Sequence, residues 1–277
     1  MKRKIKWGII SSAKIAETDL IPAINKSKNS ELVAIASRNK DKAAKFAKKN
    51  KIKKFYGSYN ELYKDKDIDV IYNPLPNHLH VNSTVKAINN NKHVLLEKPI
   101  TLKSKEVNII KKAANKKKKI VKEAFMVRHH PQWQWVKKYI KSNKIGKVNA
   151  ISTLFSYRNL DPKNIRNIKK FGGGGLYDIG CYAVVISRYL LDKEPKKVIC
   201  EANFDKKFKT DNLTSAILDF NGVYSNFIIS TSSTVSQQVL ILGSKKTICI
   251  ENPFNAKANK DTTILIYNGN SIYRKDN

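Results

Sequence analysis

A lysine at the end of an apolar run is well placed for chemistry in this sequence. Residues 92–99 read Lys-His-Val-Leu-Leu-Glu-Lys-Pro, and Lys98 stands at the expected carboxyl end of a strand. Open α/β sheets bind their ligands at that edge, and a partly desolvated lysine shifts its pKa readily enough for catalysis. Pro99 cannot join a sheet ladder, so it ends the strand where the ammonium emerges. The alternative is an ordinary surface lysine, since lysine is abundant in this chain.

A second pair with informative spacing is Asp178 and Tyr182, which follow four glycines at 172–175. Residues four apart share one face of a helix, so the two side chains can point into the same cleft. A tyrosine has an ordinary pKa near 10, so it becomes a useful base at neutral pH only beside a cation. The alternative is a core tyrosine with a satisfied hydroxyl.

The turn after the first expected strand has small residues where a dinucleotide fold requires them. Residues 7–16 read Trp-Gly-Ile-Ile-Ser-Ser-Ala-Lys-Ile-Ala, with Gly8, Ser11 and Ala13 at the three positions of the glycine fingerprint. Small side chains let the backbone approach a pyrophosphate at a helix N-terminus. Two positions lack glycine, so this motif alone is weak, but a strand precedes it and a helix follows.

The end of the second expected strand indicates which dinucleotide binds. An NAD site has an acidic residue there for the ribose 2′-hydroxyl, whereas this chain has Ser37 and Arg38. A guanidinium suits a 2′-phosphate, and Lys42, one turn into the next helix, can assist it. We therefore expect NADP, with NAD as the alternative.

The fourth expected strand runs into a stiff loop with two prolines, Asn-Pro-Leu-Pro-Asn-His-Leu-His over 73–80. Asn77 is a candidate cap for the following helix. His78 and His80 lack a nearby carboxylate or cysteine partner, so we expect no metal site. His80 is expected near the nicotinamide or as a structural residue at the helix start.

Alternating apolar runs and helical periodicity position these residues. Strands are expected at 5–10, 31–37, 69–72, 93–97 and 120–122, and helices at 14–27, 40–50, 78–91 and 103–116. This alternation predicts βαβ units and a parallel sheet. After residue 145 the pattern changes to strands at 148–157, 196–204, 215–220, 223–230, 237–242 and 247–250, with one helix at 176–191. That half predicts an antiparallel sheet with a helix at the domain junction.

The composition limits the classes of partner. The net charge of +32 is spread along the chain and is carried almost entirely by lysine. Lysine, asparagine and isoleucine have A/T-rich codons, so mutational bias explains the charge better than a nucleic-acid surface, which would need a basic stripe with aromatic residues. The cluster at 116–119 falls at an expected helix end, where cations complement the helix dipole.

The same composition bears on the compartment. Three widely spaced cysteines, Cys181, Cys200 and Cys249, indicate free thiols in a reducing compartment. Lys6 and Lys14 interrupt the first apolar stretch too early for a signal peptide. No run approaches the length of a membrane span, so we expect a cytoplasmic protein with no membrane partner.

Taken together, the motifs resemble the Gfo/Idh/MocA oxidoreductases. The matching segments are Gly-Ile-Ile-x-x-Ala at 8–13, Pro-x-Pro-Asn-x-x-His at 74–80, Glu-Lys-Pro at 97–99 and Gly-Gly-Gly-Leu-Tyr-Asp-Ile-Gly-Cys-Tyr at 173–182. Within the family, Glu-Ala-Phe-Met-Val-Arg-His-His-Pro at 123–131 and Asn-Ile-Arg at 164–166 look most like the dimeric dihydrodiol dehydrogenase and D-xylose 1-dehydrogenase branch. The resemblance runs from residue 4 to about 250.

The resemblance implies an α/β chain in two domains. Residues 1–123 would form an N-terminal Rossmann domain with a doubly wound parallel sheet. Residues 124–277 would form an α+β domain with a large, mostly antiparallel open sheet that binds substrate and forms a homodimer. Family members usually extend further at the C-terminus, so we expect this domain to be shortened after a polar tail at 271–277.

The resemblance also implies roles for individual residues. The lysine of the Glu-Lys-Pro motif maps onto Lys98 and the junction-helix aspartate onto Asp178, while Tyr182 stands where most members carry histidine. Tyr182 would take the hydroxyl proton, Lys98 would lower the tyrosine pKa, and Asp178 and Arg166 would hold the substrate. The expected cofactor-binding residues are Gly8, Ser11, Ser12, Ala13, Lys14, Ile15, Ser37, Arg38, Lys42, Pro74, Leu75, Asn77, His80, Glu97, Lys98 and Arg128.

These inferences predict an NADP-dependent dehydrogenase that acts on a sugar or vicinal diol. The alternative with the same fold is a non-catalytic NADP-binding sensor, which would need neither Lys98 nor Tyr182. A nucleic-acid binder rests on charge alone and would lose affinity steeply with salt.

Overall fold

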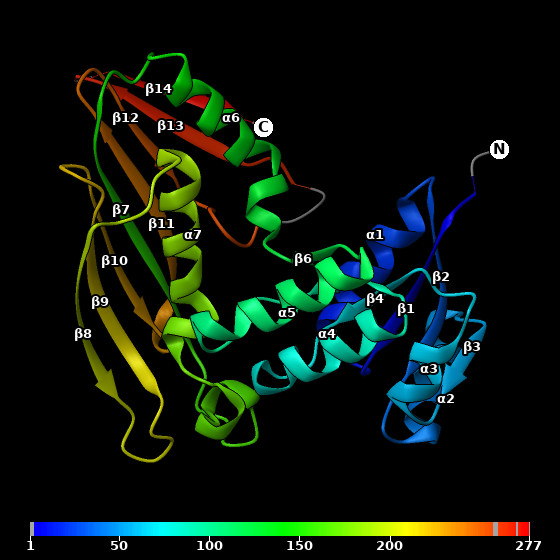
Figure 1. Cartoon of the computed structure of the whole chain (residues 1–277). Helices are drawn as coiled ribbons and strands as arrows, with labels where there is room; N and C mark the ends of the chain where they lie inside the picture. Colours follow the sequence, from blue (N-terminus) through cyan, green and yellow to red (C-terminus); the bar gives the residue numbers. More distant parts are fainter. Residues whose placement is uncertain (1–2, 257–259, 270, 277) are drawn as a thin grey trace. The chain divides into compact units, whose positions relative to one another are not determined.

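The computed structural model describes residues 3–256, 260–269 and 271–276. The chain divides into two compact units, Met1–Ala124 and Phe125–Asn277, drawn from blue to green and from green to red in Figure 1. Each unit has its own sheet and its own apolar core. Among the described residues, no helix combines the length and the hydropathy needed to cross a membrane.

The first unit is built on a six-stranded sheet with the order β3-β2-β1-β4-β5-β6. All of its strand pairs are parallel. The strands are β1 (Ile5–Ile10), β2 (Ser30–Ala36), β3 (Lys54–Tyr56), β4 (Val70–Asn73), β5 (His93–Leu96) and β6 (Val121–Glu123). The helices are α1 (Ile21–Lys26), α2 (Lys40–Asn50), α3 (Tyr59–Lys64), α4 (His80–Asn89) and α5 (Ser104–Lys117). The strand order reverses between β1 and β4, and this switch point is where doubly wound sheets bind ligands.

Local sequence explains where the helices of this unit begin and end. Asn39 caps α2 by accepting a hydrogen bond of 2.9 Å from the Lys42 backbone N–H. Ser58 and Glu61 form a reciprocal capping box at the start of α3. Lys118, in the left-handed conformation, ends α5 within the lysine cluster.

The second unit contains an eight-stranded sheet with the order β14-β13-β12-β11-β7-β10-β9-β8. Only the central pair β7–β10 is parallel, so the sheet is mostly antiparallel. Its strands are β7 (Val148–Arg158), β8 (Lys197–Phe204), β9 (Asp211–Asp219), β10 (Tyr224–Ser230), β11 (Ser232–Gly243), β12 (Thr247–Ile250), β13 (Thr263–Asn268) and β14 (Ser271–Asp276). The helices α6 (Pro131–Lys141) and α7 (Cys181–Leu191) pack on one face of it (Figure 1).

The fold class expected from sequence is confirmed: a parallel Rossmann-like sheet is followed by a mostly antiparallel one. The expected strands that form agree closely in position, although β9 and β11 begin several residues earlier than expected. Several elements were not anticipated, namely β3, α3, α6, β13 and β14. The supposed polar tail therefore contains strand β14, which pairs antiparallel with β13.

Candidate active-site residues

The turn after β1 has the geometry of a dinucleotide-binding turn. Ser11 adopts a φ of 79°, and its backbone N–H donates a 2.8 Å hydrogen bond to Ala36 O at the end of β2. A helical segment then begins at residue 14, and Ser12, Lys14 and Ile15 are exposed beside the turn. The first N–H groups of a helix have no intrahelical acceptor, so they are available to an anion.

Gly8 lies three residues before Ser11, inside strand β1, and is buried. A Cβ at this position would lie 3.1 Å from Leu62 Cδ1 and 3.2 Å from Ile68 Cγ2 and Ile71 Cδ1. A Cβ at residue 8 would therefore be tight against these three side chains, so glycine favours close packing of β1 against its neighbours.

The end of β2 carries the residues expected to recognise a 2′-phosphate. Arg38 is exposed directly before the cap of α2, and Lys42 is exposed in the first turn of that helix. Burial raises the pKa of the Tyr59 hydroxyl, and the positive charge and hydrogen bond of Arg38 oppose that rise. Ser37 is buried, and its backbone N–H donates to Tyr56 O at 3.1 Å.

These features fit a dinucleotide with an additional phosphate. The turn at residue 11 and the helix start provide amide donors for a pyrophosphate, and Arg38 and Lys42 provide cations without a carboxylate at the strand end. The loops that follow β4 and β5 lie at the same edge of the sheet, because these parallel strands also end there.

The loop after β4 is held by buried polar contacts. Asn73 is fully buried; its amide donates to Ser83 Oγ at 2.7 Å and to Thr84 Oγ1 at 3.1 Å, and its Oδ1 accepts from Leu75 N–H at 3.2 Å. Pro74 and Leu75 are buried beside it. These contacts fix the loop at the sheet edge.

One residue of this loop differs from the sequence-based expectation, and another fits the structural role that was one of its two expected alternatives. Asn77 lies in a 3₁₀ turn, Asn77–Leu79, and the cap position of α4 is Leu79, so Asn77 does not cap that helix. His80 is fully buried, and both of its ring nitrogens contact backbone carbonyls, Pro99 O and Leu75 O, at 2.8 Å. The His80 ring therefore lies between the loop after β4 and the loop after β5.

The Glu-Lys-Pro segment follows β5 at the same edge. Glu97 accepts a hydrogen bond of 2.6 Å from the Tyr72 hydroxyl, and its other oxygen accepts from Lys98 N–H at 3.2 Å. Burial raises the pKa of the Glu97 carboxyl, and the Tyr72 hydrogen bond opposes it. Lys98 is half-buried, as expected for a lysine at the end of an apolar strand.

In the second unit, Asp178 lies in a polar cluster. Its Oδ2 is 2.9 Å from Arg166 Nε and accepts a hydrogen bond of 2.6 Å from the Tyr157 hydroxyl. The charge of Asp178 raises the pKa of Arg166. Burial, followed by the charge of Asp178, raises the pKa of Tyr157 well above its usual range. The structure thus brings the expected substrate residues Asp178 and Arg166 together.

Tyr182 lies in the first turn of α7 and is 8% exposed. Its ring packs against those of Phe125, Phe155 and Phe254, with centroids 5.5, 5.9 and 5.3 Å away. Its phenol also raises the pKa of Arg166, which links it electrostatically to the Asp178 cluster.

The helical segment that carries Asp178 and Tyr182 changes its geometry along its length. Leu176–Gly180 forms a π-helical turn before α7 begins, whereas the spacing argument assumed α-helix throughout. π-Turns inside helices occur frequently at functional sites. The helix itself is therefore confirmed, but the geometry of its first turn is not the expected one.

Two residues near this cluster were missed in the sequence. Tyr157 on β7 carries no motif that marks it as a partner of Asp178. Asp211 on β9 accepts a hydrogen bond of 2.6 Å from Leu176 N–H. A Cβ on Gly174, whose φ is 124°, would lie 2.0 Å from the Asp211 carboxylate, so the glycine run makes room for this anchor.

Arg128 occupies a different position in the second unit. It lies in the short helix Met126–His129, and its guanidinium stands 5.8 Å from the centre of the Tyr189 ring on α7. His130 accepts from the Gln132 N–H at 3.3 Å and so caps α6. The structure does not bring Arg128 into the Asp178 cluster through any contact among the described residues.

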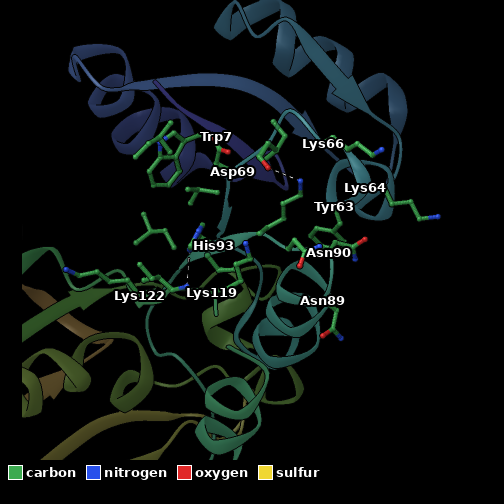
Figure 2. A pocket seen from close by; sticks show the side chains of 18 of the residues that line it. Trp7, Tyr63, Lys64, Lys66, Asp69, Asn89, Asn90, His93, Lys119 and Lys122 are labelled. Atoms are coloured by element: carbon green, nitrogen blue, oxygen red, sulfur yellow. Dashed lines mark hydrogen bonds between the residues drawn. The ribbon is translucent and has the colours of Figure 1, made fainter. Parts of the chain in front are cut away.

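A hollow of about 930 Å³ lies at the opposite, amino-terminal edge of the first sheet (Figure 2). Many of its lining residues are lysines, but Lys92 donates to the carbonyls of Asp65 and Ile68, and Asp69 pairs with Arg3. Residues at the C-terminal ends of α3 and α4 line it, and such helix ends attract cations and disfavour anions. Among these lysines, Lys64 therefore serves a helix end and Lys92 serves backbone carbonyls. None of the expected site residues lines this hollow.

In the described parts of the chain, no group of three or more His, Cys, Asp or Glu side chains is arranged to hold a metal ion. Lys98 belongs to the first unit and Asp178 and Tyr182 to the second. Within the first unit, Glu97 beside Lys98 is hydrogen-bonded to Tyr72. Within the second unit, Asp178 is bonded to Arg166 and Tyr157.

Comparisons with known proteins agree with both units. Residues 5–125 match the model described as an oxidoreductase family with an NAD-binding Rossmann fold. Residues 133–249 match the GFO/IDH/MocA C-terminal domain.

Individual relatives extend over most of the chain. It is 33% identical to trans-1,2-dihydrobenzene-1,2-diol dehydrogenase of Xenopus tropicalis, over 88% of this chain and 74% of that protein. It is 32% identical to D-xylose 1-dehydrogenase (NADP(+)) 2 of Haloferax volcanii, over 84% of this chain and 71% of the other. The solved structure of KijD10, a 3-ketoreductase from Actinomadura kijaniata in complex with NADP and TDP-benzene, has a TM-score of 0.93 and 25% identity, covering 99% of this chain and 84% of that one. The chain therefore belongs to the Gfo/Idh/MocA oxidoreductase family and has an NAD-binding Rossmann unit.

Proposed function

We propose that this protein is an NADP-dependent dehydrogenase that acts on a CH–OH group of a cyclic sugar or vicinal diol. The observation that carries the proposal is the cluster in which Asp178 is held by Arg166 and Tyr157, one helical turn before Tyr182. A pure cofactor-binding module has no use for a carboxylate and a phenol supported in this way.

In the proposed reaction, NADP supplies the acceptor for the hydride that leaves the substrate carbon. Tyr182 accepts the proton of the reacting hydroxyl, and Lys98 stabilises the phenolate so that the tyrosine can act near neutral pH. Asp178, oriented by Tyr157 and Arg166, accepts a hydrogen bond from a substrate hydroxyl. The free side of the Arg166 guanidinium, which is about half exposed, donates to a second substrate oxygen.

The preference for NADP is supported by Arg38 and Lys42 at the end of β2, where an acidic residue would favour NAD. The similar D-xylose dehydrogenase is named for NADP, and the KijD10 structure contains NADP. The substrate class is supported by the dihydrodiol and xylose dehydrogenases to which the chain is similar.

We also propose a homodimer formed through the open face of the second sheet. Outward positions on β9 and β10 carry apolar side chains, including Ile217 at 43% exposure, Ile228 at 49% and Tyr224 at 53%. Ile228 pairs across the sheet with Leu154, which is also exposed. None of the outward residues at 150–154, 213–217 and 224–228 is charged, in a chain with 54 lysines and arginines. An uncharged apolar surface of this kind is typical of an interface.

The three cysteines are free thiols, and Cys200 is exposed. This supports the proposal that the protein works in the reducing cytoplasm.

The proposed function is tested by mixing the purified protein with NADP and a panel of pentoses, hexoses and trans-dihydrodiols, with NAD in parallel, and following the absorbance of the reduced cofactor. Turnover of at least one sugar or diol with NADP is expected. Tight binding of NADP by calorimetry with no turnover of any member would instead favour the non-catalytic sensor.

A further inference from the structure

Among the buried titratable residues, His80 is one to which the proposed reaction gives no role. We propose that His80 is a positioning residue that holds the Pro99 carbonyl, and with it the loop after β5, and thereby orients Lys98. The proposal rests on the proposed function of Lys98, and the choice of variants separates the two.

The two contacts of His80 join segments that are distant in sequence. Its Nδ1 lies 2.8 Å from Pro99 O, in the residue directly after Lys98, and its Nε2 lies 2.8 Å from Leu75 O. The side chain has no exposed surface, so water does not compete for either carbonyl. A single ring therefore connects the two loops that end neighbouring parallel strands.

The segment around Lys98 is held at each neighbouring residue. Glu97 is anchored by the Tyr72 hydroxyl, Pro99 by His80, and the Ile100 N–H donates to Glu123 Oε1 at 2.7 Å. Of these three anchors, only His80 also reaches the loop at Leu75. Loss of His80 would leave the Pro99 carbonyl buried without this partner, which favours a shift of the loop.

The chemistry of the ring makes the two contacts separable. A neutral imidazole has one N–H and donates to one carbonyl at a time, while the imidazolium donates to both. The side-chain amide of asparagine reaches the place of Nδ1, and that of glutamine reaches the place of Nε2. His80→Asn therefore retains a donor toward Pro99, and His80→Gln retains one toward Leu75.

The experiment compares kcat, the Kd for NADP and the melting temperature of four variants of the full chain with those of the wild type: His80→Asn, His80→Gln, His80→Ala and Ile88→Val. Ile88 is a fully buried core residue of α4 whose apolar side chain cannot bond either loop carbonyl, so its variant reports lost stability alone. We expect kcat to fall at least about tenfold in His80→Gln and His80→Ala, because small displacements of a catalytic group are costly. His80→Asn should keep kcat within about threefold, and Ile88→Val should keep the wild-type kcat.

The inference is overturned if kcat is the same in His80→Asn and His80→Gln, or if it follows the melting temperature across all four variants. A fifth variant, Lys98→Met, distinguishes this failure from that of the proposed function. If Lys98→Met turns over normally, the proposed role of Lys98 is wrong. If it is inactive while His80→Gln and His80→Ala are fully active, Lys98 keeps its role and only the inference about His80 fails.

Discussion

The hydroxyl of Tyr157 donates a hydrogen bond of 2.6 Å to Asp178 Oδ2, the same oxygen that lies 2.9 Å from Arg166 Nε. Tyr157 lies on β7, a central strand of the second sheet, while Asp178 lies in the π-helical turn before α7. One carboxylate oxygen is thus held by a residue of a sheet strand and by Arg166 of the 3₁₀ helix Ile165–Asn167.

Removing the Tyr157 hydroxyl should loosen Asp178 without unfolding the unit. A hydrogen bond to a charged group contributes about 1.5–3 kcal/mol, so Tyr157→Phe should lower kcat/KM for the sugar or diol by about 10–100-fold. The Kd for NADP, measured by calorimetry, should stay unchanged. A variant that loses cofactor affinity to the same extent as kcat/KM would contradict a role confined to Asp178.

Arg38 should determine the choice of cofactor. If its guanidinium binds the 2′-phosphate, Arg38→Ala should lower kcat/KM with NADP by about 10–100-fold, the value of one charge-assisted contact, and leave the value with NAD nearly unchanged. Lys48→Ala, in the last turn of α2, the helix that follows Arg38, is the matched control and should alter neither value. An equal loss with both cofactors would show that Arg38 does not read the phosphate.

Glu97 should make stability depend on pH in a direction unusual for a carboxylate. Burial raises its pKa in the folded protein, so the folded state binds the proton more tightly than the unfolded chain. Its contribution to stability is therefore present below the ordinary carboxyl pKa and is lost as the pH rises through the raised value.

Glu97→Gln removes this dependence, although it also loses the acceptor for Lys98 N–H at every pH. The informative quantity is the melting temperature of Glu97→Gln minus that of the wild type, measured from pH 4.5 to 7.5. This difference should become more positive as the pH rises. A difference that stays constant or falls would mean that Glu97 is not buried as a carboxylate.

The uncharged face of the second sheet should be covered in solution. Ile228→Lys places an ammonium in the middle of that face, where it would have to be desolvated, and should convert the dimer to a monomer by sedimentation velocity. Ser142→Lys, at the exposed end of α6, adds the same charge elsewhere and should leave the dimer intact. A wild-type protein that sediments as a monomer at micromolar concentration would rule out the proposed interface.

A strand or helix of this fold could be predicted from the sequence only where a local pattern of apolar residues marks it. Strands such as β1 and β12 are short apolar runs, and their bounds were predicted to the residue. Strand β3, with only three residues, and the helix α6, whose tryptophans obscure its period, were missed. The end of the chain looked polar because β14 is an edge strand, where alternate residues need not be apolar.

The same limit applies to the site. Lys98, Asp178 and Tyr182 lie in motifs, so their types and spacing identified them. Tyr157 and Asp211 act through contacts between strands and the glycine-rich loop, which only the sheet register creates. His80 was identified as a site residue, but its two carbonyl partners could not be predicted because they lie in loops 5 and 19 residues away.

The central claim is that Tyr182 is the acid/base and that Lys98 makes it usable. The most direct test is kcat with NADP and the best sugar or diol for Tyr182→Phe, whose ring retains the packing against Phe125, Phe155 and Phe254. Because general acid–base catalysis contributes about 10²–10⁴-fold, kcat should fall by at least about a hundredfold while the Kd for NADP stays the same. A Tyr182→Phe protein that turns over within a few-fold of the wild type would contradict the account.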